Sequence, residues 1–443
     1  MSQTLEQGLT AALARIGWPA PAALERLSGG ANMESWRFSA GEQLCVLRRA
    51  PSAEMMAGRL LDHAGEAALI RAAHNAGVTA PEVLVELEPA DGLGSGFIMR
   101  ALPGTPDPAA ILAGDDPAQL LDDLARELAA IHRVAPDGLP APLMETSTAL
   151  ADLKARFMAY GGDRPVLALA LRWLEANVPA PCPLRLLHGD FRLGNLLVEH
   201  GRLTGVLDWE LAHLGDFHED LAFGCMTVWR FARPDRPGFG LGTIEALVRA
   251  YNAHGGTPVD PARLRFWLIY RTFWWALGCL QMGTFWRAGL DRSLERVVVA
   301  RRTAEQELDL LVLLEEQAPA AEQARPLSPA APPAGPILGE PSGAEILTAV
   351  SEWLASDVKP LVSGRGRFDL AVARNALGIV ARELDQRPNA SDPALAADLL
   401  SGKADLTTPS VLARLRRMTL DKLTADMPKY PALAAVRARW EGT

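Results

Sequence analysis

The sequence lacks the features that mark secreted, disulfide-rich and membrane-spanning proteins. Its four cysteines have neither metal-binding nor disulfide spacing, so a reduced cytoplasm is the expected compartment. The amino terminus has no basic segment followed by an apolar core, and no signal peptide is expected. The most apolar stretch, 266–275, is interrupted by Arg271 and is too short to span a membrane.

The chain also lacks an excess of basic residues. Lys and Arg total 44 against 53 Asp and Glu, a net charge of −9, which argues against nonspecific nucleic-acid binding. A content of 49% hydrophobic and 22% charged residues is typical of a globular protein, and 443 residues are enough for two or three domains. We therefore expect no nucleic-acid partner and no membrane association.

The most informative stretch that is present reads HGDFRLGN at 188–195 and is followed by an apolar run that ends in Asp208. Phosphoryl transfer from ATP requires a carboxylate that deprotonates a hydroxyl and oxygen ligands for magnesium. Asp190 is the candidate catalytic base, and Asn195 and Asp208 are the candidate Mg²⁺ ligands. Asp and Asn are also ordinary turn and cap residues, but this complete set in this order favours the catalytic interpretation.

The residues between Asn195 and Asp208 have the pattern of a hairpin. An apolar run at 196–198 leads to a turn that contains Gly201, and a second apolar run occupies 203–207. A hairpin of this kind returns the chain to its starting end, which would place the two candidate Mg²⁺ ligands together.

The motif order over roughly residues 20–310 resembles the aminoglycoside phosphotransferase superfamily of kinase-like small-molecule phosphotransferases. In protein kinases the two motifs read HRD and DFG. This chain has HGD at 188–190 and DWE at 208–210, which favours the small-molecule branch of the superfamily. The resemblance implies an α+β, two-lobed, protein-kinase-like fold with a small mixed N-lobe and a helical C-lobe. It also implies that ATP binds between the lobes.

A phosphate-covering loop and a cation for the phosphates are expected in the N-lobe. Gly29 and Gly30 precede a predicted hairpin at 34–49, and backbone amides there could approach phosphate. Kinases usually carry Lys at the end of the third strand, where this chain has Arg48, a bulkier and permanently charged residue. The alternative is an arginine that simply faces solvent. Glu66, in a predicted helix, is the expected partner of Arg48.

The resemblance divides the chain into four parts. The N-lobe, with short strands and one helix, is expected at 1–105, and the C-lobe with the catalytic loop at 106–316. The hinge between them would bind adenine, with Met99 and Leu102 as candidate contacts. An Ala/Pro-rich linker is expected at 317–338. The segment 339–443 is expected to be a separate all-α domain, similar to a helical domain of unknown function found beside such phosphotransferases.

Two groups of residues bear on which molecule would accept the phosphate. Asp216, Glu219 and Asp220 could hold a cationic aminoglycoside, but we favour their capping a helix that begins near Leu221. The resemblance also implies that Asp220 supports the catalytic loop structurally. An apolar acceptor pocket is suggested by tryptophans and methionines of the C-lobe, namely Trp229, Trp267, Trp274, Trp275, Trp286, Met226 and Met282.

The best functional hypothesis is an ATP- and Mg²⁺-dependent kinase of a small-molecule hydroxyl. The pattern Val-Leu-Arg at 46–48 is usual in the superfamily branch fused to, or encoded beside, acyl-CoA dehydrogenases, which implies a hydroxyacyl-CoA thioester such as a 4-hydroxyacyl-CoA as acceptor. Alternatives are an aminoglycoside or amino-alcohol kinase and a catalytically weak kinase-like binding protein. Basic residues of the carboxyl-terminal region could contact CoA phosphates, namely Arg414, Arg416, Arg417, Lys422 and Lys429, but a solvated helix face is the favoured interpretation.

Overall fold

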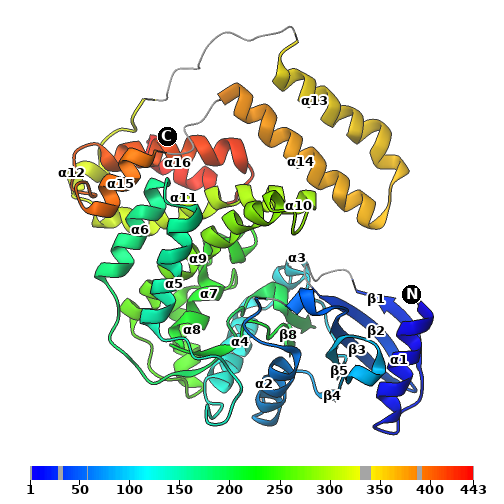
Figure 1. The fold of residues 1–443 in the computed structure, drawn as a ribbon. Coiled ribbons are helices and arrows are strands. Elements are labelled where there is room, and N and C mark those ends of the chain that lie inside the picture. Colours follow the sequence, from blue (N-terminus) through cyan, green and yellow to red (C-terminus); the bar gives the residue numbers. More distant parts are fainter. Residues whose placement is uncertain (1, 28–32, 57, 330–340, 387–391, 443) are drawn as a thin grey trace. The chain divides into compact units, whose positions relative to one another are not determined.

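The computed structural model describes residues 2–27, 33–56, 58–329, 341–386 and 392–442. The chain forms two compact units (Figure 1): unit 1 comprises 1–146 and 180–267, and unit 2 comprises 147–179 and 268–443. None of the described helices is long and apolar enough to cross a membrane. The boundaries expected at 105, 316 and 338 stay predictions.

Unit 1 begins with a five-stranded antiparallel sheet in the order β1-β2-β3-β5-β4. The strands are β1 Pro21–Arg26, β2 Glu34–Ala40, β3 Gln43–Ala50, β4 Val83–Glu86 and β5 Ser95–Arg100. The hairpin predicted at 34–49 is β2 and β3, with Trp36 opposite Leu47. Successive side chains of a strand point to opposite faces, so Leu47 and Arg48 lie on different faces of the sheet.

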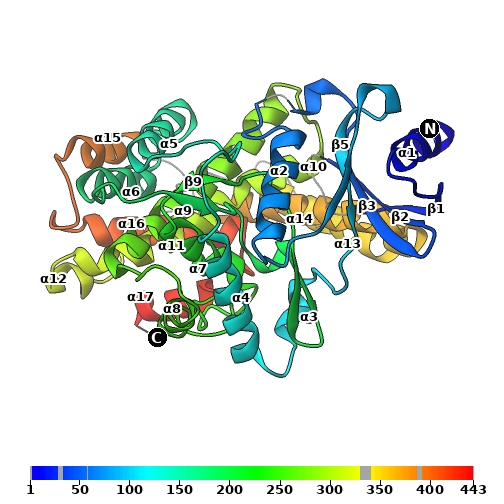
Figure 2. The ribbon, with the colours of Figure 1, turned by 90° about the horizontal axis from the view of Figure 1, so that it is seen from below.

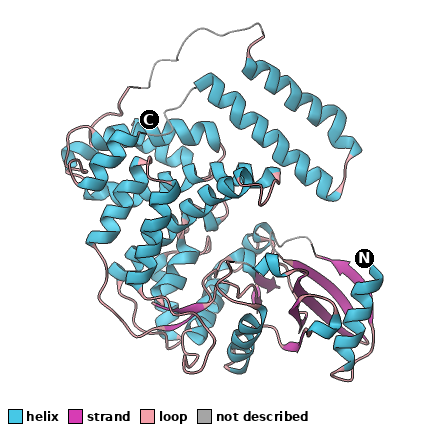
Figure 3. Cartoon of the chain, viewed as in Figure 1, coloured by secondary structure: helices cyan, strands magenta, loops and turns pink. Residues whose placement is uncertain are grey.

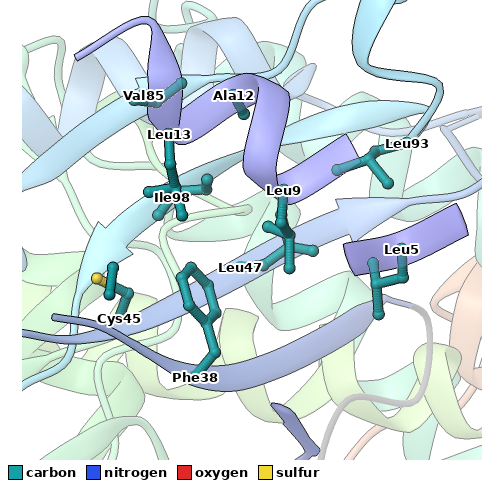
Figure 4. Packing of buried hydrophobic residues seen from close by; sticks show 11 residues of the cluster. Leu5, Leu9, Ala12, Leu13, Phe38, Cys45, Leu47, Val85, Leu93 and Ile98 are labelled. Atoms are coloured by element: carbon teal, nitrogen blue, oxygen red, sulfur yellow. The ribbon is translucent and has the colours of Figure 1, made fainter. Parts of the chain in front are cut away.

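Each face of this sheet is covered by a helix (Figure 2). Helix α1 (Ser2–Ala14) places Leu5, Leu9 and Leu13 at helical spacing against Phe38 and Leu47, in a core shown in Figure 4. Helix α2 (His63–Asn75) packs on β4 and β5 from the other face, the face of Arg48. The expectation of one helix in the N-lobe was wrong, because α1 also belongs to it.

The remainder of unit 1 carries the predicted catalytic segments. Its elements are η1 Ala53–Met56, η2 Pro89–Asp91, α3 Pro108–Leu112, α4 Pro117–Ile131, β6 Arg185–Leu187, η3 Leu193–Asn195, β7 Leu196–Glu199, β8 Arg202–Val206, β9 His213–Gly215, α7 His218–Cys225, η4 Thr227–Arg230 and α8 Ile244–Ala253. The predicted hairpin is β7 and β8. It is fixed to α4 by Arg202, whose Nε and Nη2 donate to the buried carboxylate of Asp123 at 2.7 and 2.8 Å.

The described elements of unit 2 are all helical (Figure 3). They are α5 Thr146–Tyr160, α6 Pro165–Ala176, α10 Leu294–Arg301, α11 Thr303–Leu314, η5 Glu315–Gln317, α12 Ala320–Gln323, α13 Gly343–Trp353, the π-helical η6 Leu354–Val358, η7 Lys359–Leu361, α14 Gly364–Gln386, α15 Pro393–Ser401, α16 Val411–Asp426 and α17 Leu433–Glu441. Helix α9 (Pro261–Arg287) begins in unit 1 and ends in unit 2. The all-helical carboxyl-terminal region is therefore confirmed.

One expectation for unit 2 was wrong in part. Arg416 and Lys422 are not on a solvated helix face, because both are buried and paired with Glu315 and Glu307, respectively. Arg414 and Lys429 are exposed, as expected.

The segment expected to be a linker contains the short helix α12, whose Glu322 is buried. The role of this segment as a linker stays a prediction.

Candidate active site

The backbone of the catalytic loop is held in one conformation by its own histidine. Gly189 has φ +80°, and a Cβ atom there would lie 2.2 Å from the carbonyl oxygen of Leu211, so only glycine fits. The buried ring of His188 accepts from the Asp190 N–H at Nδ1 (3.2 Å) and donates from Nε2 to the carbonyl of Leu207 (2.9 Å). Burial lowers the pKa of His188, which keeps the ring neutral and suits this single tautomer.

Asp220 anchors the same loop from helix α7. Its buried carboxylate accepts from the backbone N–H groups of His188 (2.7 Å) and Gly189 (2.8 Å). Burial alone would raise its pKa, but hydrogen bonds from His132 and the backbone hold the pKa of Asp220 at about 2. Helix α7 begins at His218 rather than near Leu221, so the capping role favoured for Asp220 was wrong.

Asp190, the predicted base, is oriented by two donors. The Asn195 side-chain amide donates to Asp190 Oδ2 at 2.7 Å, and Arg192 Nε donates to Oδ1 at 2.9 Å. Arg192 itself lies over the ring of Trp229, 4.6 Å from its centre. Burial and the nearby Asp208 raise the pKa of Asp190, while Arg192 opposes them. A carboxylate held this way with a raised pKa is suited to accepting a proton.

Asn195 and Asp208 meet at one end of the β7–β8 hairpin. The Leu207 N–H donates to the Asn195 carbonyl at 2.8 Å, and Asp208 follows in a left-handed conformation (φ +67°) with 31% of its side chain exposed. The Asn195 amide nitrogen is bonded to Asp190, so its amide oxygen remains to bind a cation. The part of the chain that the structure describes has no metal site of three or more His, Cys, Asp or Glu. One amide oxygen and one carboxylate, completed by phosphates, is nevertheless a donor set that Mg²⁺ accepts.

Arg48 lies at the centre of a charged network. Its Nη2 donates to Asp208 Oδ1 and Glu210 Oε2, both at 2.7 Å, and its Nε forms an ion pair with Glu66 Oε1 at 3.1 Å. Arg59 Nη1 donates to the same oxygen of Glu210 at 2.6 Å. Burial would lower the pKa of Arg48, but the three carboxylates raise it. The alternative of a solvent-facing arginine is therefore wrong for Arg48, and the network holds three carboxylates against two guanidinium groups.

The predicted pair of Arg48 and Glu66 is brought together, although their assigned roles stay predictions. Glu66 is buried in helix α2, and this burial raises its pKa to about 7 against the opposing charge of Arg48. Sequence reasoning missed Arg59 and Glu210. Glu210 stands inside the DWE motif and could have been found there, whereas nothing in the sequence around Arg59 distinguishes it.

The other predicted nucleotide contacts are only partly described. Met99 lies in β5 opposite Val46, and the Leu102 side chain packs over the backbone of Gly205 in β8. Gly29 and Gly30 lie outside the described residues. The hinge residues therefore have definite positions next to the catalytic hairpin, and adenine binding at the hinge stays a prediction.

The carboxylates considered for a cationic acceptor are not exposed to one. Asp216 is buried and accepts from His218 Nδ1 and Arg263 Nη1, both at 2.6 Å. Glu219 is buried with an oxygen 3.3 Å from His213 Nε2.

Of the residues suggested for an apolar acceptor pocket, Trp229, Trp267 and Met226 are buried. The other four are half-buried in α9, namely Trp274, Trp275, Met282 and Trp286. The apolar acceptor pocket stays a prediction.

Residues 23–267 match the family model described as the phosphotransferase enzyme family, APH. This chain belongs to that family. The match covers the sheet, the catalytic loop and the Asp208 strand, which are the parts that carry the geometry above.

This phosphotransferase is also similar to curated proteins over part of its length. It is 28% identical over 268 residues, 54% of its own length, to acyl-CoA dehydrogenase family member 10 of Mus musculus. It is 32% identical over 80 residues, 18% of its length, to a probable aminoglycoside 3'-phosphotransferase of Lactococcus lactis. The alignments span only 24% and 27% of those two relatives.

Solved structures confirm the kinase-like fold of this phosphotransferase. A Ralstonia eutropha protein, provisionally named an aminoglycoside phosphotransferase, is 19% identical with a TM-score of 0.57, and the match covers 71% of this chain and 98% of that one. A thermostable mutant of aminoglycoside phosphotransferase APH(4)-Ia, in ternary complex with ADP and hygromycin B, is 20% identical with a TM-score of 0.50, and the match covers 72% and 100%. At these identities the likeness speaks for the fold alone.

Proposed function

We propose that this protein uses Mg-ATP to phosphorylate the hydroxyl of a hydroxyacyl-CoA or a related hydroxyacyl metabolite. Its membership of the phosphotransferase family supports the broader activity, phosphate transfer to the hydroxyl of a small molecule. The observation that carries the proposal is the convergence of Asp190, Asn195, Asp208 and Arg48, which lie up to 160 residues apart in the sequence.

Each of these residues has a role that its surroundings support. Asp190 would accept the proton of the acceptor hydroxyl as the oxygen–phosphorus bond forms and the bond to the departing ADP breaks. Asn195 and Asp208 would hold Mg²⁺, which neutralises charge on the phosphates when bound. Arg48 would bind phosphate oxygens, with Glu66 keeping its guanidinium in place.

The choice of acceptor rests on two supports. First, Asp216, Glu219 and Asp220 are buried and bonded to groups of this chain, so they are not available to bind the ammonium groups of an aminoglycoside. Second, two of the matching curated proteins are named as acyl-CoA dehydrogenases, in Mus musculus and Arabidopsis thaliana. An acyl-CoA with a hydroxyl group is the metabolite class that connects such an enzyme to a kinase.

The test measures ADP release by the full chain with Mg-ATP on 4-hydroxyacyl-CoAs, free hydroxy acids and aminoglycosides, each beside the Asp190→Asn variant. Turnover of a hydroxyacyl-CoA that Asp190→Asn abolishes is the expected result. Turnover confined to aminoglycosides would overturn the proposed hydroxyacyl acceptor but would agree with the proposed kinase activity. ATP binding without turnover of any acceptor would favour the binding-protein alternative, and Arg48→Lys would then show whether the arginine is responsible.

A further inference from the structure

The hairpin formed by α13 and α14 is almost without buried side chains. Over the described segment 341–386, only Ile379 is buried. The hairpin contacts the rest of unit 2 through polar groups, because Arg301 Nη2 lies 2.7 Å from the carboxylate of Glu383 and Arg382 Nε donates to the carbonyl of Ala425 at 2.7 Å. A fixed pair of helices that buries so little is an incomplete helical bundle.

The hairpin exposes several large apolar side chains. Ile346, Val350 and Trp353 follow each other at the i, i+4, i+7 spacing of one helix face, and all three are exposed, Trp353 by 56%. Leu361, at the turn, is 82% exposed, and Phe368 at the start of α14 is exposed as well. These five side chains leave roughly 500 Å² of apolar surface in water, the larger part of the roughly 800 Å² per partner that a stable interface buries.

The charges near the turn of the hairpin are unevenly distributed. The end of α13 and η6 carry the acidic residues Glu352 and Asp357, and the start of α14 carries Arg365 and Arg367 with one acidic residue, Asp369. Within the described residues these acidic and basic groups form no ion pair with each other; Arg365 pairs with Asp369 and with Glu295 of α10. An acidic helix end beside a basic one is complementary to a second copy of itself, because a two-fold axis repeats each contact.

We propose that this hairpin is a dimer interface, at which α13 and α14 of two copies form a four-helix bundle. The two-fold axis runs along the hairpins, so that both turns lie at the same end. The acidic end of α13 then faces the basic start of α14 of the partner, and the Trp353 side chains are enclosed between the pairs. Area and charge thus point to a second copy of this chain as the occupant.

The first experiment measures the mass of the full chain by light scattering during size exclusion over a range of concentrations. We expect a dimer whose dissociation constant rises at least about 30-fold with Trp353→Glu, the effect of losing a central aromatic. Leu290→Glu is the matched control, because Leu290 is 75% exposed outside the hairpin and should leave the constant unchanged. A monomeric wild type, or a dimer that Trp353→Glu does not weaken, would overturn the proposal.

A charge exchange tests the arrangement of the helices. The variant Glu352→Lys/Asp357→Lys makes both helix ends basic, and Arg365→Glu/Arg367→Glu makes both acidic, so each should be monomeric alone. Mixed together they should form a heterodimer, because each acidic end again meets a basic one. Circular dichroism verifies that both variants fold. Two folded variants that fail to pair would contradict the arrangement, and the Trp353→Glu result decides the interface independently.

Discussion

The two units of this phosphotransferase use buried charge in opposite ways. In unit 1, three carboxylates surround Arg48, and two of them are partly open to solvent. In unit 2, the carboxylate of Glu307 is enclosed by Lys422 and by Arg164, whose Nη1 lies 3.2 Å away, and the pair of Glu307 and Lys422 is fully buried. The Arg48 network of unit 1 therefore has surplus negative charge on a side that faces solvent. The Glu307 cluster of unit 2 keeps its cations and its anion away from solvent.

The Arg48 network can exchange an ion-pair partner for a ligand, whereas the Glu307 cluster can only keep the ion pairs that it already has. A surplus carboxylate near solvent can give up an arginine for a metal ion at small cost, because the arginine keeps other partners. A closed set has no such freedom, and the loss of one member leaves a charge buried without compensation. The comparison therefore predicts that substitutions of the partly exposed site residues of unit 1 change activity, whereas those in the closed Glu307 cluster of unit 2 change stability.

The largest effect is expected at Asp190. Asp190→Asn keeps the size of the side chain but removes its ability to accept a proton, so kcat should fall up to about 10⁴-fold. The apparent melting temperature should stay close to that of the wild type. Steady-state ADP release measures kcat, and a thermal melt measures the melting temperature. A lower melting temperature with an unchanged kcat would contradict the catalytic role of Asp190.

The next effect is expected at Glu307 in unit 2. Glu307→Leu leaves Lys422 and Arg164 without their carboxylate, so the free energy of unfolding should fall by about 3–5 kcal/mol in urea titrations. The double variant Glu307→Leu/Lys422→Met should recover part of the loss, because the uncompensated lysine is gone. ADP release per folded molecule should be unchanged, and a selective loss of turnover would break the assignment of this cluster to stability.

A smaller effect on activity is expected at Asp220, which is buried but touches the catalytic loop. Asp220→Asn keeps one oxygen acceptor for the two backbone N–H groups of His188 and Gly189, so the loop loses one bond, worth about 1–3 kcal/mol. We expect a lower kcat together with lower stability. Asp216→Asn is the matched control, since Asp216 is equally buried but bonds to His218 and Arg263, and it should lower stability alone.

The smallest effect is a dependence on pH through Glu66. Its folded pKa of about 7 lies above the ordinary 4.5, so the stability it contributes is fully present below pH 4.5 and is lost as the pH rises through 7. The ion pair with Arg48 follows the opposite trend, and the KM for ATP should rise as the pH falls below 7. Glu66→Gln should flatten both profiles, and an unchanged profile would assign the titration to another group.

Local structure around the motifs could be predicted from the sequence. The hairpin after Asn195 and the strands around Arg48 follow from apolar alternation and a glycine-containing turn. Helix α1 was missed, although its leucines have helical spacing. Residues close in sequence therefore carried most of the correct predictions.

Contacts over long sequence distances could not be predicted in the same way. The bond from Arg59 to Glu210 joins residues 151 positions apart, and no local pattern distinguishes Arg59 from other surface arginines. From the local sequence alone Asp220 looked like a helix cap, because its bonding partners at 188 and 189 are not neighbours in sequence. Its support of the loop was implied only by the family resemblance. Arg416 and Lys422 looked solvated for the same reason: their buried partners belong to other helices.

The left-handed glycine of the catalytic loop has a consequence for genetic variation. Any change in the first two bases of a glycine codon either ends the chain or replaces Gly189 with a residue that has a Cβ atom, and that atom would meet the Leu211 carbonyl. Only the third base of this codon can therefore drift without damage. In natural populations or a saturation library, functional variants should all have glycine at position 189, while the third base of its codon varies.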